Sequence, residues 1–265
     1  MSLAQEHLAA GRVRDALAAL QAEVRARPAD PKLRVFLFQL LCVLGQWPRA
    51  ATQLEVCGEL DASTLAMVNT YREALKCELV REAVFAGKTT PMVFGEPQPW
   101  VAWLIEALQA DARGDRAGAT RLRAEALEMA PTSAGSANGE PFEWIADADS
   151  RLGPVLEAVV NGRYCWIPFG ALSAVHMQAP EDLRDFVWQP AQLEFPNGGN
   201  SVALVPTRYC GVADGAADAE LLARTTEWDE LAPDQYAGHG QRLLATSGTE
   251  LGLLELRELV INASG

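Results

Sequence analysis

Residues 11–16 read Gly11-Arg12-Val13-Arg14-Asp15-Ala16, and residues 45–50 read Gly45-Gln46-Trp47-Pro48-Arg49-Ala50. The second stretch follows the first at a distance of 34 residues, and the same shift carries Leu20 onto Leu54. A period of 34 is typical of the tetratricopeptide unit, in which a turn joins two antiparallel helices. We therefore predict that the first half of the chain is built from helical hairpins of this kind.

The matched positions have mechanical roles in such a hairpin. Glycine enters the left-handed region without steric cost, so Gly11 and Gly45 can turn the chain between two helices. Alanine is small enough to lie where two helices cross closely. Pro28 and Pro31 would end one unit and begin the next, because proline breaks a helix interior but is tolerated in a first turn.

A third, less regular match follows, and its positions are Trp103, Ala107, Gly114, Ala119, Ala126 and Pro131. Between the units, residues 63–87 predict one long helix capped by Ser63 or Thr64, and the proline-rich residues 88–99 predict a loop. We expect six to eight helices before residue 131. Such a stack has a concave face formed by the first helix of each pair, which binds a peptide or a partner helix in many repeat proteins. The alternative is that the stack only supports the second half.

The second half has a different pattern. Residues 131–139 are small and polar and predict a linker, and residues 152–160 predict a short helix because their apolar residues repeat at helical spacing. Strands are predicted at 164–169, 192–195, 201–205, 241–244 and 254–259. The predicted fold class is therefore α+β, with a TPR-like helical domain at residues 1–131. A small, mostly antiparallel sheet or partly open barrel would occupy residues 141–265.

The composition limits the classes of function. The chain has 265 residues and a formal net charge of -13, and such a surface repels nucleic acid and anionic membranes. The start of the chain lacks the pattern of a signal peptide, and its least charged stretch, residues 35–48, is too short to span a bilayer. The five cysteines form no Cys-x-x-Cys pair, which argues against a zinc site or a disulfide framework. These observations indicate a reducing cytoplasm.

Motifs of catalysis and cofactor binding are missing from the sequence. It contains no glycine-rich phosphate loop, no His-Glu-x-x-His and no G-x-S-x-G, and the three histidines are scattered. We predict no catalytic residues, no metal and no cofactor. The most enzyme-like feature is the group Asp147, Asp149 and Arg151. We interpret its acids as caps of the helix predicted at 152–160, with an ion pair to Arg151 or Arg163; the alternative is a hydrolase or small-ligand site.

The segment from Asp214 to Asp234 is acidic and contains one arginine, Arg224. Its alanine- and glycine-rich start predicts a solvated loop that leads into a short helix. A docking strip for a basic partner is the alternative function of this segment.

Three blocks of the second half carry a resemblance to a known family. Residues 147–157 read DADSRLGPVLE, residues 162–169 read GRYCWIPF, and residues 183–188 read LRDFVW. The sequence resembles the ImpE family, also called TagJ or SciE-type, of accessory components of bacterial type VI secretion systems, over nearly the whole chain. The resemblance implies a non-enzymatic adaptor that binds a helix of the small contractile-sheath subunit, with the sheath-disassembling AAA+ ATPase as a possible second partner.

The candidate partner-binding residues fall into two groups. The helical half contributes Phe36, Leu40, Trp47 and Trp103, and the second half contributes Arg151, Arg163, Tyr164, Trp166, Arg184, Arg208 and Tyr209. Arginine pairs with carboxylates and stacks on aromatic rings. Three roles stay open for the arginines: an internal ion-pair network, a surface that binds a partner, and a small-ligand pocket.

Overall fold

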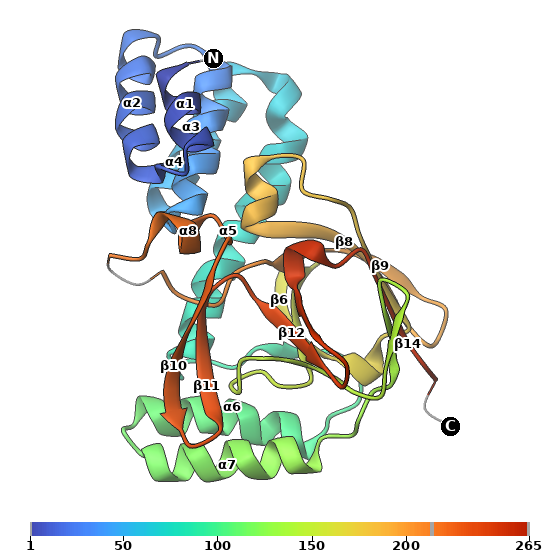
Figure 1. The fold of residues 1–265 in the computed structure, drawn as a ribbon. Helices are drawn as coiled ribbons and strands as arrows, with labels where there is room; N and C mark the ends of the chain where they lie inside the picture. The colour runs from blue at the N-terminus through green and yellow to red at the C-terminus, as the bar shows by residue number, and fades with distance from the viewer. Residues whose placement is uncertain (1, 213–214, 264–265) are drawn as a thin grey trace.

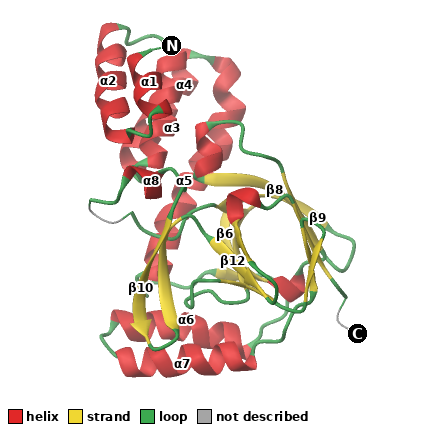
Figure 2. Ribbon diagram, in the orientation of Figure 1, coloured by secondary structure: helices red, strands yellow, loops and turns green. Residues whose placement is uncertain are grey.

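The computed structural model describes residues 2–212 and 215–263, with helices at both ends of the molecule and strands between them (Figures 1 and 2). The α-helices are α1 (Leu3–Ala9), α2 (Val13–Ala26), α3 (Pro31–Val43), α4 (Trp47–Leu60), α5 (Leu65–Phe85), α6 (Pro99–Ala112), α7 (Arg116–Met129) and α8 (Asp218–Leu221). Seven of them precede residue 131, as predicted.

The two helical hairpins predicted from the 34-residue period are present. Gly11 and Gly45 have φ angles of +74° and +65° and turn the chain from α1 to α2 and from α3 to α4. Ala16 and Ala50 are completely buried where the helices meet. Pro31 is the first residue of α3, and the Asp30 carboxylate accepts hydrogen bonds from the backbone N–H groups of the first turn.

The long helix α5 confirms the prediction for residues 63–87, although its cap differs from the predicted one. A 3-10 turn, Ala62–Thr64, precedes α5, and the Asp61 carboxylate accepts a hydrogen bond from the backbone N–H of Ser63. The Thr64 hydroxyl donates to the carbonyl oxygens of Cys57 and Asp61, so it satisfies the end of α4 rather than the start of α5.

The third hairpin, α6 and α7, forms as predicted but does not continue the stack. Figure 1 places it at the end of the molecule opposite α1 to α4. Its apolar face, with Trp100 and Leu104, packs with Val155, Val159 and Trp166 of the sheet. Hairpins α1–α2 and α3–α4 instead pack with the first part of α5. The stacked repeat therefore contains two hairpins, because the third hairpin covers the sheet.

The strands form one large sheet, one small sheet and one hairpin in the described chain. The large sheet has the order β1 (Met92–Val93), β6 (Arg163–Pro168), β5 (Val155–Val160), β9 (Asn200–Pro206), β8 (Trp188–Glu194), β7 (Ala174–Met177), β14 (Glu258–Ile261), β2 (Gly135–Ala137) and β3 (Glu140–Phe142). The small sheet has the order β13 (Glu250–Gly252), β12 (Leu243–Thr246) and β4 (Ile145–Asp147), and the hairpin is β10 (Thr226–Ala232) with β11 (Gln235–Gly240).

Neighbouring strands pair antiparallel except for β1 and β6, which are parallel. The sheets do not close into a barrel. The α+β class and the mostly antiparallel sheet are thus confirmed.

The helix predicted at residues 152–160 is wrong, because these residues form strand β5. All six β5 side chains are buried. Leu156, Ala158 and Val160 face one apolar cluster of the sheet, while Val155 and Val159 face the helices. A strand covered on both faces loses the alternation of polar and apolar residues that identifies a strand, so its run of apolar residues imitates a helical pattern.

Three other local predictions need correction. The predicted linker at 131–139 contains β2, whose Gly135 and Ala137 are buried beside β14. The strand predicted at 254–259 begins as a 3-10 turn, Leu253–Glu255, and only β14 is extended. In the acidic segment the short helix α8 is present, but residues 226–232 form β10 rather than a loop; Asp214 lies outside the described residues. None of the described helices combines the length and apolarity needed to cross a bilayer.

Candidate partner-binding site

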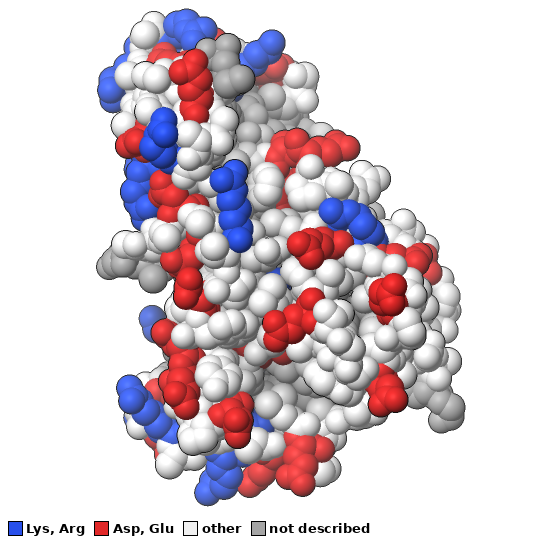
Figure 3. Space-filling view, viewed as in Figure 1, with Lys and Arg blue, Asp and Glu red and all other residues white. Residues whose placement is uncertain are grey.

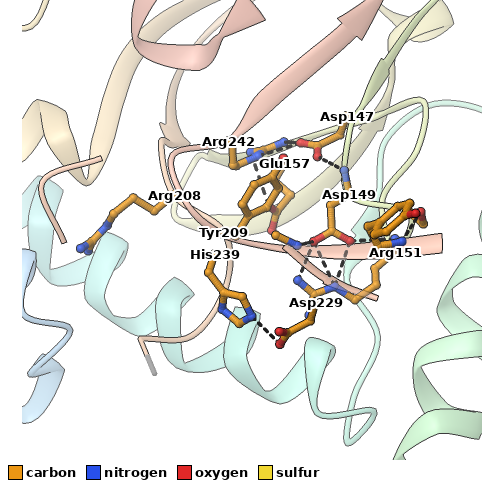
Figure 4. A network of polar contacts seen from close by, with 12 residues as sticks. Asp147, Asp149, Arg151, Glu157, Arg208, Tyr209, Asp229, His239 and Arg242 are labelled. Carbon is orange, nitrogen blue, oxygen red and sulfur yellow. Dashed lines mark hydrogen bonds and ion pairs between the residues drawn. The ribbon is translucent and has the colours of Figure 1, made fainter. Parts of the chain in front are cut away.

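A buried ion-pair network joins α5 to the sheets. Figure 4 shows its members Asp147, Glu157 and Arg242. The Arg81 guanidinium donates to both carboxylate oxygens of Glu157, at 2.7 and 2.9 Å. The Arg242 guanidinium lies 3.4 Å from Glu157 and donates to Asp147 at 2.7 and 2.9 Å. Each of these side chains is at most 4% exposed. Helix α5, strand β5 and the small sheet are therefore connected by charges that do not reach the surface.

The two carboxylates of this network have opposite pKa shifts. Burial alone would raise the pKa of Glu157, but Arg81 and Arg242 hold it at about 2. For Asp147 burial prevails over the attraction of Arg242 and raises the pKa to about 6. Glu157 is ionised because two guanidinium groups surround it.

The Asp147, Asp149 and Arg151 group is a folded turn rather than an open cleft. Asp149 is completely buried, accepts from the backbone N–H of Gly238 at 3.0 Å, and pairs with the guanidinium of Arg151. Arg151 also lies 5.0 Å from the ring centroid of Phe85. The prediction that the acids cap a helix is wrong, because β5 follows, whereas the predicted ion pair to Arg151 is present. A hydrolase site needs carboxylates that face substrate, and both of these face protein.

The other predicted arginines differ in their partners. Arg208 is 6% exposed and donates to the carbonyl oxygens of Val43, Leu221 and Cys42; burial lowers its pKa to about 10. Arg184 pairs with Asp182 and lies 4.8 Å from the ring centroid of Tyr71. Arg163 is exposed at the start of β6. Two of the four predicted arginines, Arg151 and Arg184, thus belong to internal ion pairs.

Most of the predicted aromatic residues are structural supports. Tyr164 donates its hydroxyl hydrogen to Glu157 and accepts from Trp166 Nε1 at 2.8 Å. The ring of Tyr209 lies under Gly238, where an added Cβ would approach a ring carbon to 2.2 Å. Trp103 is half-buried against the sheet. Tyr164, Trp166 and Tyr209 are thus buried, whereas Trp103 is partly exposed.

The side of the repeat that carries Phe36 and Leu40 is covered by the chain itself. Leu40 is completely buried and Phe36 is half-buried in the helical core. The 3-10 turn Leu183–Phe186 contacts α3, and the Asp218 carboxylate of α8 accepts from the backbone N–H of Val13 at 2.8 Å. The second half therefore contacts both α3 and the start of α2.

A polar hollow of about 350 Å³ separates the helical half from hairpin β10–β11. Charged side chains that line it already bind other protein groups. Arg81 binds Glu157, Glu82 accepts from the Trp47 indole, and Arg208 donates to carbonyl oxygens. Among the described residues no group of histidine, cysteine, aspartate and glutamate side chains could hold a metal ion.

A second hollow is apolar and lies between α4 and α5. We call it the α4–α5 groove; it measures about 300 Å³ and is lined by Trp47, Pro48, Ala51, Leu54, Glu55, Arg72, Leu75, Lys76 and Leu79. Leu79 is 53% exposed at its edge. Trp47 is the one predicted partner-binding residue in its lining. The sequence alone places Arg72, Leu75, Lys76 and Leu79 on one face of a predicted helix. It does not show that this face lies beside α4.

The fold and this groove define a TPR-like helical protein joined to a mostly antiparallel sheet. The sequence is 51% identical to the type VI secretion system accessory component TagJ of Pseudomonas aeruginosa, over 97% of this chain and 90% of that protein. The ImpE protein family matches residues 139–260. The chain belongs to the ImpE family, and this membership supports an accessory role in type VI secretion.

The fold is also found in a solved structure. The crystal structure of protein VPA1032 from Vibrio parahaemolyticus superimposes with a TM-score of 0.91 over 98% of both chains, at 24% sequence identity. The arrangement of helical hairpins on the sheet is therefore preserved at low sequence identity.

Proposed function

We propose that this chain is a non-enzymatic cytoplasmic adaptor of a type VI secretion system that binds a helix of the small contractile-sheath subunit. The observation that carries the proposal is the α4–α5 groove, because an apolar hollow open to water on a helical repeat is typical of surfaces that bind another helix. The similarity to an accessory component of type VI secretion gives the biological context.

The non-enzymatic part of the proposal is supported by the positions of the acids. Asp147, Asp149 and Glu157 are at most 3% exposed and are bound by arginines. Burial of paired carboxylates stabilises a structure but does not provide a free acid or base. The sheath-disassembling AAA+ ATPase is the second proposed partner, because the resemblance to the ImpE family implies it.

Calorimetric titration tests this function. The purified chain is titrated with the small sheath subunit, and then with the same subunit lacking the helix. We expect micromolar binding of the intact subunit and loss of binding when the helix is deleted. Absence of binding to the intact subunit at high micromolar concentration would overturn the proposal.

A further inference from the structure

We propose that the α4–α5 groove binds an amphipathic helix in one orientation, with the helix's acidic flank along α5 and its basic flank along α4. This inference rests on the proposed adaptor function and adds which residues of the groove contact the helix and the charge pattern of that helix.

The groove has a buried apolar floor and one exposed apolar wall. Trp47, Leu54 and Leu75 are 7%, 1% and 4% exposed, so they form a floor already supported by the core. Leu79 is 53% exposed beside them. Covering Leu79 with apolar side chains of a partner removes its exposed surface from water, which favours binding.

The floor is rigid before any partner arrives. Trp47 Nε1 donates to the Glu82 carboxylate at 2.6 Å. The Trp47 ring packs on Trp188 with centroids 5.8 Å apart, and Trp188 Nε1 donates to Glu78 at 2.7 Å. A side chain fixed at both its ring and its N–H loses little conformational entropy when a partner packs on it.

The shape of the groove favours a helix over an extended segment. Arg72, Leu75, Lys76 and Leu79 have the spacing i, i+3, i+4 and i+7, so they share one face of α5. Trp47, Ala51 and Leu54 share the adjacent face of α4. Two such faces form a hollow lined by side chains and offer few backbone groups. An extended segment would leave its own N–H and C=O groups unpaired there, whereas a helix satisfies them internally.

Opposite charges border the two sides of the groove. Arg72 and Lys76 lie on the α5 side, and Glu55 is exposed on the α4 side. Lys76 pairs with Glu73 at 2.8 Å, but both side chains remain about half exposed and free to reorient. On the face drawn in Figure 3, acidic side chains are spread over the whole molecule and most basic side chains lie over its two helical ends. Complementary charges fix the orientation of a bound helix more than they add affinity.

The first test changes one exposed leucine at a time. Leu79→Glu places a charge at the wall of the groove, and Leu65→Glu is the matched control, because Leu65 is 49% exposed on the same helix but outside the groove. We expect Leu79→Glu to weaken binding of the small sheath subunit about tenfold or more, and Leu65→Glu to leave it within about twofold. Ala51→Arg, which fills the groove from α4, should reproduce the loss.

The second test measures orientation with two designed helical peptides. Both carry leucines at i, i+3 and i+7; one has glutamates on one flank and lysines on the other, and the second has lysines on both flanks. We expect the wild-type chain to prefer the peptide with one acidic and one basic flank. The Arg72→Glu/Lys76→Glu variant, whose groove is acidic on both sides because Glu55 remains, should prefer the peptide with two basic flanks. Equal affinity of both peptides for both proteins would overturn the orientation.

The outcomes separate this inference from the adaptor function. If the sheath subunit binds the wild-type chain and the Leu79→Glu variant equally, the groove is not the site, although the adaptor function stands. If the subunit does not bind the wild-type chain at all, the adaptor function fails. Sedimentation of the chain alone tests whether a second copy of the chain occupies the groove. A dimer that Leu79→Glu dissociates would show that it does, and this result would also overturn the inference.

Discussion

Glu157 has an uncommon environment for an acid in the middle of a buried strand. It is completely buried, and two guanidinium groups, from Arg81 and Arg242, lie within 3.4 Å of its oxygens. The Tyr164 hydroxyl donates to it as well. Removing one member of such a network leaves buried charges without a partner, which costs more than the intact pair contributes.

Glu157→Gln should therefore lower the free energy of unfolding by about 3–5 kcal/mol at pH 7. The folded pKa of about 2 lies below the ordinary value of 4.5, so the stability that ionised Glu157 contributes is complete above pH 4.5. It is lost as the pH falls from 4.5 to 2. The difference between the wild-type chain and the variant should shrink over this window, as measured by urea unfolding at several pH values.

Two further variants control this experiment. Glu73→Gln removes a half-exposed partner of Lys76 and should change the free energy of unfolding by less than about 1 kcal/mol. Tyr164→Phe keeps the charge but removes one hydrogen bond to Glu157 and leaves Trp166 Nε1 without its acceptor. A loss of about 1–3 kcal/mol is expected for it. Equal stability of all three variants would contradict the role of the network.

At the scale of the elements, local sequence signals predicted the helical hairpins and the strands that overlap β6, β8, β9 and β12, but they predicted strand β5 as a helix. Gly11, Gly45 and Gly114 end helices with φ angles of +65° to +81°, and the requirement for glycine at such positions is local. Strand β5 has no such signal, because its burial on both faces comes from segments elsewhere in the chain. A period of two appears only when one face of a strand meets water.

Two glycines at helix ends allow the stability cost of a steric clash to be distinguished from the cost of a left-handed backbone. Gly87 follows α5 with φ +66°, and an added Cβ would lie 2.6 Å from the Cβ of Ala112; Gly114 has φ +81° and nothing within 4 Å. Gly114→Ala should cost about 1 kcal/mol of stability from the left-handed backbone alone. Gly87→Ala should cost about 1–3 kcal/mol more, because α5 and α6 must separate.

Thermal unfolding followed by circular dichroism measures both variants. The stabilities of the two variants can be compared directly, because each variant adds one methyl group at a positive φ angle. A Gly87→Ala variant as stable as Gly114→Ala would show that α6 shifts without cost.

At the scale of the whole molecule, α5 connects the two halves. Its first part, with Val68 and Leu75, belongs to the core of the first two hairpins, and its last part, with Val84, packs with α6 and the sheet. Arg81, near its end, binds Glu157 of the sheet. The division into residues 1–131 and 141–265 stays a prediction, and the position of α5 argues that both parts unfold together.

A core substitution at the far end of the molecule tests this coupling. Leu104 of α6 is completely buried against the sheet, so Leu104→Ala should cost about 2–5 kcal/mol. We expect one cooperative transition at a lower Tm, coincident for helical circular dichroism and for tryptophan fluorescence. Leu60→Ala, at a position 39% exposed on α4, is the control and should leave the Tm nearly unchanged. Two separate transitions would instead support independent domains.

The sequence alone determined the helical hairpins, their turns, the α+β class and the resemblance to the ImpE family. Spacing, glycine turns and proline starts act over a few residues, so these features can be read along the chain. Tertiary structure decided that α6 and α7 cover the sheet, that Arg81 and Arg242 enclose Glu157, and that the α4–α5 groove stays open. These depend on which surfaces meet, and Arg242 is 85 residues from Glu157 along the chain. Pairing over such a separation is set by the burial of the whole core, which no local pattern records.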